Sequence, residues 1–462
     1  MDTFIKVIIT FLRFLWYCYQ LSKNQWLKPP RLRRLQRKRL RAILKHAYEN
    51  VKIYNEKLDS VGIKPDDIKT VEDLQKLPFT TKQEVWSGIP SQSIAKGYDI
   101  NKCVKMSTSG TSGGPMPVYY DKRFWDYVSA ARYRSRRAVG ISPLDKYFRI
   151  QFRGLPSRNQ GAGKETSGVK HRSRWKTSLG LAYYLFRGFQ KTACITYAAD
   201  EIISGIIEFQ PKVLSGNPSY LRLITETIAD IGIKDFHPKV LLSRGEVLDE
   251  PTRKFLESSF GCPVFEIYGA YEVGSISWEC KRKEGQHISA DLLILEIIRD
   301  GEPVGPCERG EIVVTGLLNY AMPLIRYRLG DVGILGDERC SCGRSFPLLK
   351  SIEGRAVDCF TLPSGRIVPP KPIMTAIQGT PGVSRYQAVQ ESKNKVTIEL
   401  MKHKNDSDVS ISELTARCRE VLGEDIEIEV FVGTRENLKA KFRPVISKLH
   451  VSEEPRWTSP RG

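Results

Sequence analysis

The sequence lacks an uninterrupted apolar run long enough to cross a membrane. The segment from Phe4 to Leu21 is strongly apolar, but Lys6 and Arg13 interrupt it, whereas a membrane-spanning helix needs about 20 apolar residues. No small-residue cleavage site follows this segment, which argues against a secretory signal peptide. The ten cysteines among 462 residues do not resemble a disulfide framework and are typical of a reducing compartment, so we expect a cytoplasmic protein.

Acidic residues are scarce relative to basic ones. The chain has 52 Asp and Glu against 72 Lys and Arg, which gives a formal net charge of +20. Such an excess indicates an anionic partner, which could be nucleic acid, an acidic membrane face or a phosphate-rich substrate; a solvated basic surface is the alternative. Nucleic acid is the least favoured partner, because the basic clusters lack interleaved, repeated aromatic platforms.

The basic residues are concentrated in two stretches. Eight of them, with no acid, lie between Arg31 and Lys45, and a second basic stretch runs from Arg153 to Arg187. Before the first stretch, four apolar side chains are spaced to share one helical face: Phe11, Phe14, Leu15 and Tyr19. We interpret residues 1–30 as an amphipathic helix that lies on the anionic inner face of a membrane, aided by the first basic stretch. A helix packed on the protein's own body explains the pattern equally well.

The length of the chain indicates two or more domains. In the middle of the chain, short apolar strands alternate with helical patterns, as at residues 240–243, 251–260 and 264–268, and this alternation predicts an α/β fold. Beyond Gly354, strand, helix and strand patterns predict a small α+β unit. We therefore expect four regions: an amphipathic segment at residues 1–30, a large domain at 31–353, a small domain at 354–450 and a flexible tail at 451–462.

Eight consecutive residues from Ser107 to Gly114 are Ser, Thr or Gly, and Pro115 follows them. Glycines let a backbone curve so that several N–H groups point inward, and hydroxyls donate further hydrogen bonds to phosphate oxygens. The segment is not a Walker loop, because no Gly-Lys-Ser/Thr ends it. A flexible linker has a similar composition, but apolar segments flank this one, which favours a nucleotide phosphate loop. Its expected binding residues are Ser107, Thr108, Ser109, Gly110, Thr111, Ser112 and Gly113.

This loop resembles the signature of the adenylate-forming superfamily, and the sequence looks most like the phenylacetate–CoA ligase branch, which includes CapK-type proteins named for capsular polysaccharide biosynthesis. Four further segments match in the family's order: Tyr268-Gly-Ala-Tyr-Glu272, Tyr327-Arg-Leu-Gly-Asp331, Gly354-Arg355 and Lys441-Phe-Arg443. Two more look like this branch: Ser215-Gly-Asn-Pro-Ser219 and Gly245-Glu246. The resemblance covers residues 40–450, and five ordered motifs are far more specific than any single one.

The resemblance implies a large adenylation domain of mixed sheets and helices with a small, mobile α+β lid at the C-terminal end. The implied reaction is ATP-dependent activation of a carboxylic acid as an acyl-adenylate, with release of pyrophosphate and transfer of the acyl group to a thiol such as CoA. The CapK likeness suggests a context of cell-envelope polysaccharide assembly. Two alternatives remain open: transfer to an amine or a sugar, and a non-catalytic, basic, membrane-peripheral binding protein of the same fold.

The reaction develops negative charge on the α-phosphate and on pyrophosphate, so the site must supply cations and preorganised donors. Glu272 is the candidate Mg²⁺ ligand, because Mg²⁺ prefers one or two carboxylates with phosphate oxygens. The resemblance places Tyr268 near the adenine, Asp331 on the ribose hydroxyls with Arg355 nearby, and Lys441 between the substrate carboxylate and the α-phosphate. Gly245, Glu246 and Gly269 complete the expected nucleotide site. Each residue alone would more often be structural; their order together favours function.

Three departures from the family pattern are visible. Tyr271 stands where the family has Thr or Ser before the glutamate, and Ala440 replaces the glycine before the motif lysine. The hinge usually reads Gly-Arg-x-Asp, but here position 357 is Val and the acid is Asp358. None of these changes removes a charge that the chemistry needs, although the last one leaves open which residue is the pivot of the lid.

Two cysteine-containing segments predict a structural zinc site. Cys340 and Cys342 share a tight turn, and Cys280 and His287 lie close together upstream. Thiolates and a neutral imidazole are what tetrahedral Zn²⁺ accepts, and these four residues make a Cys₃His set. Two unrelated pairs of buried residues are the alternative. Bound Zn²⁺ would tie the strand region of Glu272 to the loop of Asp331.

Overall fold

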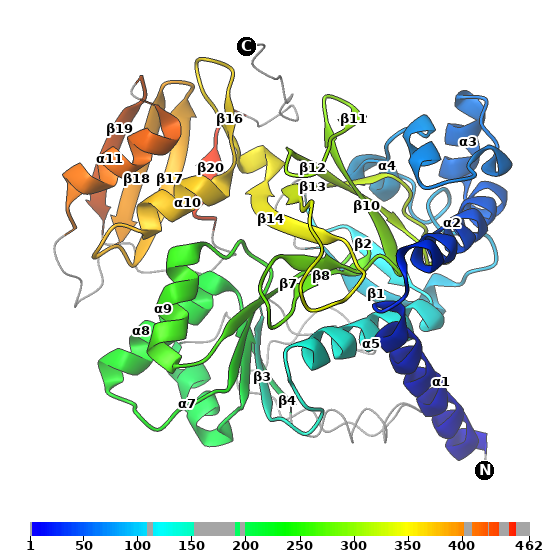
Figure 1. Ribbon diagram of the computed structural model, residues 1–462, viewed down its shortest axis with the longest axis horizontal. Coiled ribbons are helices and arrows are strands. Elements are labelled where there is room, and N and C mark those ends of the chain that lie inside the picture. Colours follow the sequence, from blue (N-terminus) through cyan, green and yellow to red (C-terminus); the bar gives the residue numbers. More distant parts are fainter. Residues whose placement is uncertain are drawn as a thin grey trace.

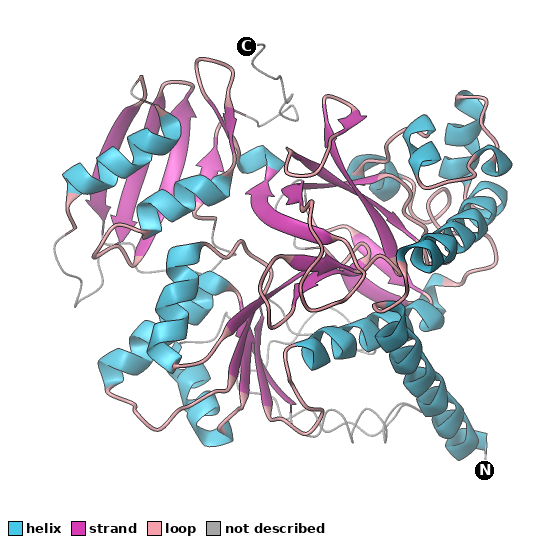
Figure 2. Ribbon diagram, in the orientation of Figure 1, coloured by secondary structure: helices cyan, strands magenta, loops and turns pink. Residues whose placement is uncertain are grey.

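The predicted α/β class is confirmed. The protein has one long mixed sheet with helices on its faces, and a second, smaller sheet is formed by residues near the C-terminus (Figures 1 and 2). The structure is a computed structural model that describes residues 2–108, 114–151, 190–194, 199–401, 409–423, 425–433 and 443–449. The basic stretch from Arg153 to Arg187 and the expected tail at 451–462 lie outside these described residues.

The N-terminal part is helical. Its helices are α1 (Asp2–Asn24), α2 (Pro29–Asn50), α3 (Lys52–Ser60), η1 (Pro65–Asp67), η2 (Glu72–Lys76) and α4 (Lys82–Ser87). Helix α4 begins with a capping box, because Thr81 accepts from the backbone N–H of Glu84 at 3.3 Å while Glu84 accepts from that of Thr81 at 2.7 Å.

The next elements form a hairpin followed by a long helix. They are η3 (Ile100–Lys102), β1 (Val104–Ser107), β2 (Pro117–Tyr120) and α5 (Lys122–Ala138). Helix α1 packs on α5, where Tyr17 stacks on Tyr127 with ring centroids 4.0 Å apart. The side chain of Arg13 donates to Asp126 at 2.8 Å. One face of α1 is therefore attached to the body of the protein.

The outer face of α1 is exposed and apolar. It carries Ile9, Leu12, Leu15, Trp16 and Tyr19. Of the face expected from the sequence, only Leu15 and Tyr19 are exposed, while Phe14 packs against the core, because α5 occupies the side of the helix on which Phe14 lies. Among the helices of the described part of the chain, none is both long and apolar enough to cross a membrane.

The long sheet has twelve strands in the order β11-β10-β12-β13-β14-β9-β8-β7-β6-β5-β3-β4. Strands β4, β3, β5, β6 and β7 are parallel, and the strands from β7 to β11 pair antiparallel. The parallel strands are β3 (Tyr147–Gln151), β4 (Gln190–Cys194), β5 (Val213–Gly216), β6 (Val240–Ser243) and β7 (Val264–Ala270). The others are β8 (Gly274–Glu279), β9 (Gln286–Ile288), β10 (Leu293–Arg299), β11 (Glu302–Pro303), β12 (Arg309–Gly316), β13 (Tyr327–Leu335) and β14 (Leu348–Arg355).

Three amphipathic helices cover one face of the parallel strands. They are α7 (Ala199–Phe209), α8 (Pro218–Ile231) and α9 (Glu250–Phe260). Their apolar faces bury Ile206, Leu221 and Leu256 against strand residues such as Phe148 and Leu241. This arrangement is the crossover architecture that parallel strands require, because each strand must be followed by a return segment across one face of the sheet.

The residues after β14 build their own hydrophobic cluster, which spans Phe360 to Val445. Its elements are η4 (Ala356–Asp358), β15 (Phe360–Thr361), β16 (Ile367–Val368), α10 (Pro370–Gln378), β17 (Arg385–Ser392), β18 (Lys395–Met401), α11 (Ile411–Leu422), β19 (Glu427–Gly433) and β20 (Val445–Ser447). The strand order of the small sheet is β19-β18-β17-β20. Its strands and α11 confirm the alternating patterns predicted beyond Gly354.

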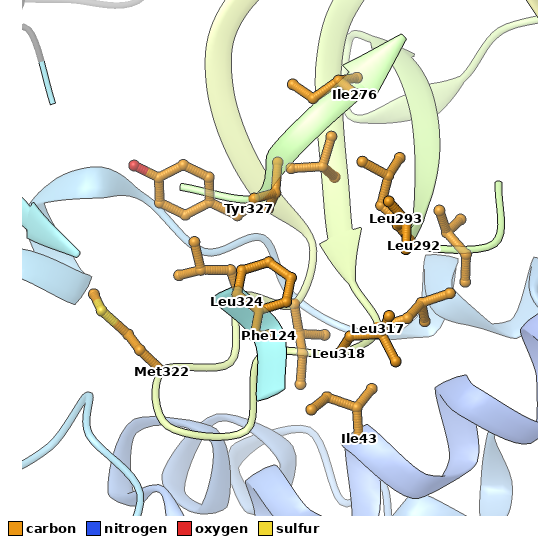
Figure 3. Packing of buried hydrophobic residues seen from close by; sticks show 14 of the residues in the cluster. Ile43, Phe124, Ile276, Leu292, Leu293, Leu317, Leu318, Met322, Leu324 and Tyr327 are labelled. Carbon is orange, nitrogen blue, oxygen red and sulfur yellow. The ribbon is translucent and has the colours of Figure 1, made fainter. Parts of the chain in front are cut away.

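The largest core cluster joins the N-terminal helices to the antiparallel half of the sheet. Figure 3 shows Ile43 of α2 and Phe124 of α5 near Leu293, Leu317 and Leu324. A buried ion pair lies at the edge of this region. Arg134 of α5, 1% exposed, donates to Asp291 at 2.7 Å, and the same carboxylate accepts from Asn24 at 3.0 Å.

We expect Asp291→Ala to reduce the free energy of unfolding by about 3–5 kcal/mol, because it leaves the Arg134 guanidinium buried without its carboxylate. Urea unfolding of the full chain measures the loss. The matched control is Glu56→Ala, which breaks an exposed pair with Lys52 and should cost less than about 0.5 kcal/mol. Equal stability of the two variants would contradict this account.

Candidate active site and metal centre

The predicted nucleotide residues gather where the parallel strands end. Strands β5, β6 and β7 are neighbours, so Asn217, Gly245 and Glu272 follow their carboxyl ends at one edge of the sheet. Ligands of open α/β sheets bind at this edge, because the loops that leave the strands there diverge. The position is therefore suited to a small-molecule site.

Tyr268, Asp331 and Arg355 are in direct contact. The Tyr268 hydroxyl donates to Asp331 Oδ2 at 2.6 Å, and Arg355 Nε lies 3.1 Å from Asp331 Oδ1. Arg355 also donates to the carbonyl of Leu329 at 2.9 Å. Burial, followed by the Asp331 charge, raises the pKa of Tyr268 well above its usual value, so the phenol stays protonated as the donor. Asp331 is thereby fixed with both carboxylate oxygens engaged.

Glu272 is half-buried directly after β7, near these three residues. Burial raises its pKa, the Asp331 charge raises it further, and the cations Arg355 and Lys82 oppose the shift. A bound divalent cation would favour the ionised carboxylate and offset this burial. The residue therefore fits the expected role of a Mg²⁺ ligand, with phosphate oxygens as the other ligands.

Lys82 lies beside the candidate site, and the sequence analysis did not name it. Its ammonium donates to the carbonyl of Gly114 at 2.8 Å, at the end of the predicted phosphate loop. Burial lowers its pKa, Glu272 raises it and Arg355 lowers it, which places Lys82 within electrostatic reach of both. The segment before Lys82 is held in place because the backbone of Thr80 bonds to Arg326 and Arg328 on either side of Tyr327.

The two ends of the predicted phosphate loop are described. Ser107 ends β1, and the Thr108 hydroxyl accepts from the backbone N–H of Met116 at 2.9 Å. Thr108 therefore closes the base of the loop. Gly114 has φ +96°, and a Cβ there would lie 2.8 Å from Trp86, so this position requires glycine. The intervening residues Ser109, Gly110, Thr111, Ser112 and Gly113 lie outside the described part of the chain.

Glu246 has a structural partner in this arrangement. Its carboxylate accepts from the Asn217 amide at 2.8 Å and from the Ser219 hydroxyl at 2.6 Å, at the N-terminus of α8. A carboxylate at a helix N-terminus is stabilised by the unpaired N–H groups there. Gly245 and Glu246 thus join the ends of β6 and β5, while Gly269 lies next to Tyr268 in β7.

The boundary after β14 is tightly packed. Gly354 has φ +122°, and a Cβ there would lie 2.5 Å from Pro370 of α10. The acid that departs from the family pattern, Asp358, pairs with Arg443. Lys441 itself lies outside the described residues, and Arg443, two residues later in the chain, is the nearest described residue after it.

The four predicted zinc ligands converge. The Cys280 and Cys340 sulfurs are 3.6 Å apart, Cys342 Sγ is 3.4 Å from His287 Nε2, and all four donor atoms lie within 4.8 Å of one another. Tetrahedral Zn²⁺ with bonds of about 2.0–2.3 Å would separate its ligand atoms by about 3.5–3.8 Å. Burial lowers the pKa of His287 to about 4, which keeps the ring neutral, as a metal ligand must be.

The loop that carries two of these cysteines also touches the N-terminal helices. Between β13 and β14, Arg344 donates to the Gln25 side chain at 2.9 Å, and the backbone N–H of Ser345 donates to the Gln25 carbonyl at 2.9 Å. The guanidinium of Arg344 lies 4.8 Å from the ring centroid of Trp26. The donor set therefore links β8, β9 and this loop to the connection between α1 and α2.

Comparison with known proteins identifies the family. The phenylacetate–coenzyme A ligase of Escherichia coli (strain K12) is 32% identical over 349 residues, which cover 73% of this chain and 74% of that protein. The chain belongs to the phenylacetate–coenzyme A ligase family. Protein CapK of Staphylococcus aureus is 26% identical over 389 residues, 81% of this chain and 79% of that protein. No family model matches the sequence.

Solved structures agree on the fold. A 2-hydroxyisobutyryl-CoA ligase in its postadenylation state, bound to an acyl-AMP, has a TM-score of 0.74 at 19% identity and covers 93% of this chain and 92% of that one. As a member of the phenylacetate–coenzyme A ligase family, the protein is an adenylate-forming acid–thiol ligase. The predicted family, fold and enzyme class are confirmed by these comparisons.

We expect Cys280→Ser to lose bound zinc, because it removes one of four converging donors, and to lower the free energy of unfolding by several kcal/mol. Structural Zn²⁺ binds with apparent free energies of about 10–16 kcal/mol, much of which stabilises the fold. Inductively coupled plasma mass spectrometry of purified protein and thermal unfolding measure the two effects. Cys307→Ser, at an exposed cysteine outside the donor set, is the control. Purified wild-type protein without zinc would contradict the prediction.

Proposed function

We propose that this ligase activates a carboxylic acid with ATP to give an acyl-adenylate and pyrophosphate, and then transfers the acyl group to CoA. The observation that carries the proposal is the contact of Tyr268 with Asp331 and Arg355 beside Glu272 and Lys82, in a member of this family. The named relatives are CoA ligases, and one neighbour was solved with an acyl-AMP and CoA.

In the first half-reaction, a carboxylate oxygen attacks the α-phosphorus and pyrophosphate leaves. Asp331 would accept hydrogen bonds from the ribose hydroxyls, and Glu272 would hold Mg²⁺ on the phosphates. Lys82, next to the phosphate loop, would place a positive charge beside the departing pyrophosphate. Lys441 would bridge the carboxylate and the α-phosphate. In the second half-reaction, the thiol sulfur attacks the acyl carbon and AMP leaves.

The small domain at residues 354–450 would act as the lid between these two steps. Its contacts with the large domain include polar ones, such as the bond from Arg222 to the carbonyl of Val383 at 3.2 Å and that from Lys371 to Ser351 at 2.9 Å, beside the packing of Val247 against its hydrophobic cluster. Polar contacts of this kind can be exchanged at little cost, because water replaces them on opening. We include the Cys₃His zinc centre as a structural part of the same enzyme.

The exposed face of α1 supports the proposal that the enzyme lies on an anionic membrane surface. Leu12 and Trp16 are 58% and 55% exposed, one turn apart. Helix α2 follows directly with seven exposed basic residues: Arg31, Arg33, Arg34, Arg37, Lys38, Arg41 and Lys45. Apolar side chains can insert between lipid tails while basic ones attract anionic headgroups. Together with the CapK likeness, this surface favours a role in cell-envelope polysaccharide assembly.

ATP–pyrophosphate exchange across a panel of aryl, fatty and hydroxy acids measures the first half-reaction. We expect exchange with one class of acid, and a loss of about 100-fold or more in Lys82→Met and Glu272→Gln, because the first removes the positive charge beside the phosphates and the second removes the carboxylate that would hold Mg²⁺. Lys441→Ala should be similarly impaired. Lys102→Met, at an exposed lysine, is the control.

Measuring whether CoA is consumed in the reaction of the same acid distinguishes a thiol acceptor from an amine or a sugar. Acyl-adenylate formation without CoA consumption would reject CoA as the acceptor. Absence of exchange with every acid of the panel, together with absence of ATP binding, would contradict the proposed reaction and favour the non-catalytic alternative.

Co-sedimentation with vesicles of phosphatidylcholine and phosphatidylglycerol tests the membrane surface. The triple variant Arg34→Gln, Arg37→Gln, Lys38→Gln should bind about 100-fold more weakly, since each basic residue contributes about 1 kcal/mol. Trp16→Glu should also release the protein. Leu144→Glu, at an apolar residue that is 69% exposed elsewhere, should bind as the wild type does. Wild-type protein that stays in the supernatant would refute the proposal.

A further inference from the structure

Four arginines converge beside the candidate active site, and we call them the arginine cluster: Arg132, Arg136, Arg149 and Arg244. Two come from α5, one from β3 and one from the residue after β6. Strand β3 pairs with β5 so that Arg149 is opposite Ser215, and the backbone N–H of Arg244 donates to Gly216 at 3.1 Å. The β-sheet register thus fixes two of the four positions.

Tyr147 lies against two members of the arginine cluster. Its ring centroid is 4.2 Å from the guanidinium carbon of Arg136 and 5.7 Å from that of Arg149. Burial alone would raise the pKa of Tyr147, but the charges of Arg136, Arg149 and Arg244 outweigh burial and lower the pKa to about 7. This tyrosine can therefore carry at most one negative charge against four positive ones.

The described residues supply no carboxylate to the arginine cluster. None of its four members forms an ion pair there, although Arg149 is only 8% exposed. By contrast, Arg134 on the same helix is buried and is paired with the carboxylate of Asp291. The sequence between β3 and β4 adds no acidic excess, because residues 152–189 contain eight Lys and Arg and one Glu.

A group of like charges without an opposite charge is costly to the fold when Arg149 is buried and the other three arginines are half-buried. Burial, followed by the neighbouring arginines, lowers the pKa of Arg132 to about 10 and that of Arg244 to about 9, so both remain charged at neutral pH while repelling each other. Proteins keep such charges mainly where a bound partner of opposite charge completes the site. Guanidinium groups suit carboxylate, sulfate and phosphate, because their forked N–H donors match two oxygens at once.

The arginine cluster adjoins the nucleotide residues. The Tyr120 hydroxyl donates to the carbonyl of Tyr271, next to Glu272. Both the Arg132 charge and the Glu272 charge reach Tyr120. Arg244 directly precedes Gly245 and Glu246. A molecule whose reacting carboxylate lies near Glu272 could therefore extend to the arginine cluster.

We propose that the arginine cluster binds a second anionic group, a carboxylate, sulfate or phosphate, on the acid that this ligase activates. This assignment rests on the proposed function. We therefore expect such an acid to be preferred over plain fatty and unsubstituted aryl acids, which would leave the arginine cluster unpaired. The same anion chemistry is present in the phosphates of CoA, so the test must separate the acid from the thiol.

Thermal unfolding with matched acids tests binding without catalysis. We expect 1,4-phenylenediacetate and glutarate to raise the Tm of the wild-type protein by several degrees, and phenylacetate and pentanoate to raise it far less. Arg149→Gln and Arg244→Gln should each abolish the difference. Arg137→Gln, an exposed neighbour on α5, should keep it. Equal shifts for both kinds of acid, or a difference that survives both variants, would overturn the proposal.

Exchange kinetics then assign the anion. ATP–pyrophosphate exchange involves no CoA, so at least a tenfold rise in KM for the dianionic acid in Arg149→Gln, with the KM for ATP unchanged, supports the proposal. If only the KM for CoA rises, the anion belongs to the thiol and the proposal is wrong. If exchange is silent for every acid while the thermal difference persists, the proposed function fails and the arginine cluster remains an anion site of another kind. If the Gln variants do not fold, the same measurements are made on Arg136→Lys, which keeps the charge.

Discussion

The carboxylate of Asp331 joins three parts of the chain that are far apart in sequence. It accepts from Tyr268 at the end of the parallel strands, lies on β13 in the antiparallel half of the sheet, and pairs with Arg355 at the end of β14. Both of its oxygens are engaged, so its orientation is set by the fold before any ligand binds. Preorganisation of this kind is what a nucleotide site needs, because donors and acceptors that are already aimed lose little entropy on binding. The positions of Glu272 and Lys82 depend on the same meeting of strands.

Several features of this site could be predicted because their signals are local. The apolar run at residues 264–268 predicted the strand β7, which contains Tyr268 and ends just before Glu272. The spacing of Cys340 and Cys342 indicated a tight turn. The spacing of residues along the chain does not predict that β9 pairs with β14, and this pairing brings His287 to that turn. A register of this kind is decided by the whole sheet and has no local sequence signal.

Other features could not be predicted from the sequence, because they too depend on how distant segments pair. Lys82 lies in a capped helix whose capping box is readable, but its approach to Gly114 depends on the pairing of Thr80 with β13. The arginine cluster draws on α5, β3 and the end of β6, so its members look like unrelated surface residues when they are read along the chain. In helix α1, the amphipathic pattern could be recognised from the sequence. The face that packs inward could not, because it is determined by contact with α5.

The contact between Gly354 and Pro370 has a mechanical consequence. Because even one additional carbon at position 354 would lie 2.5 Å from the proline ring, any residue other than glycine there would have to push α10 away from the end of β14. Glycine at this position therefore permits the close approach of α10 to the long sheet, and a larger residue would widen that spacing.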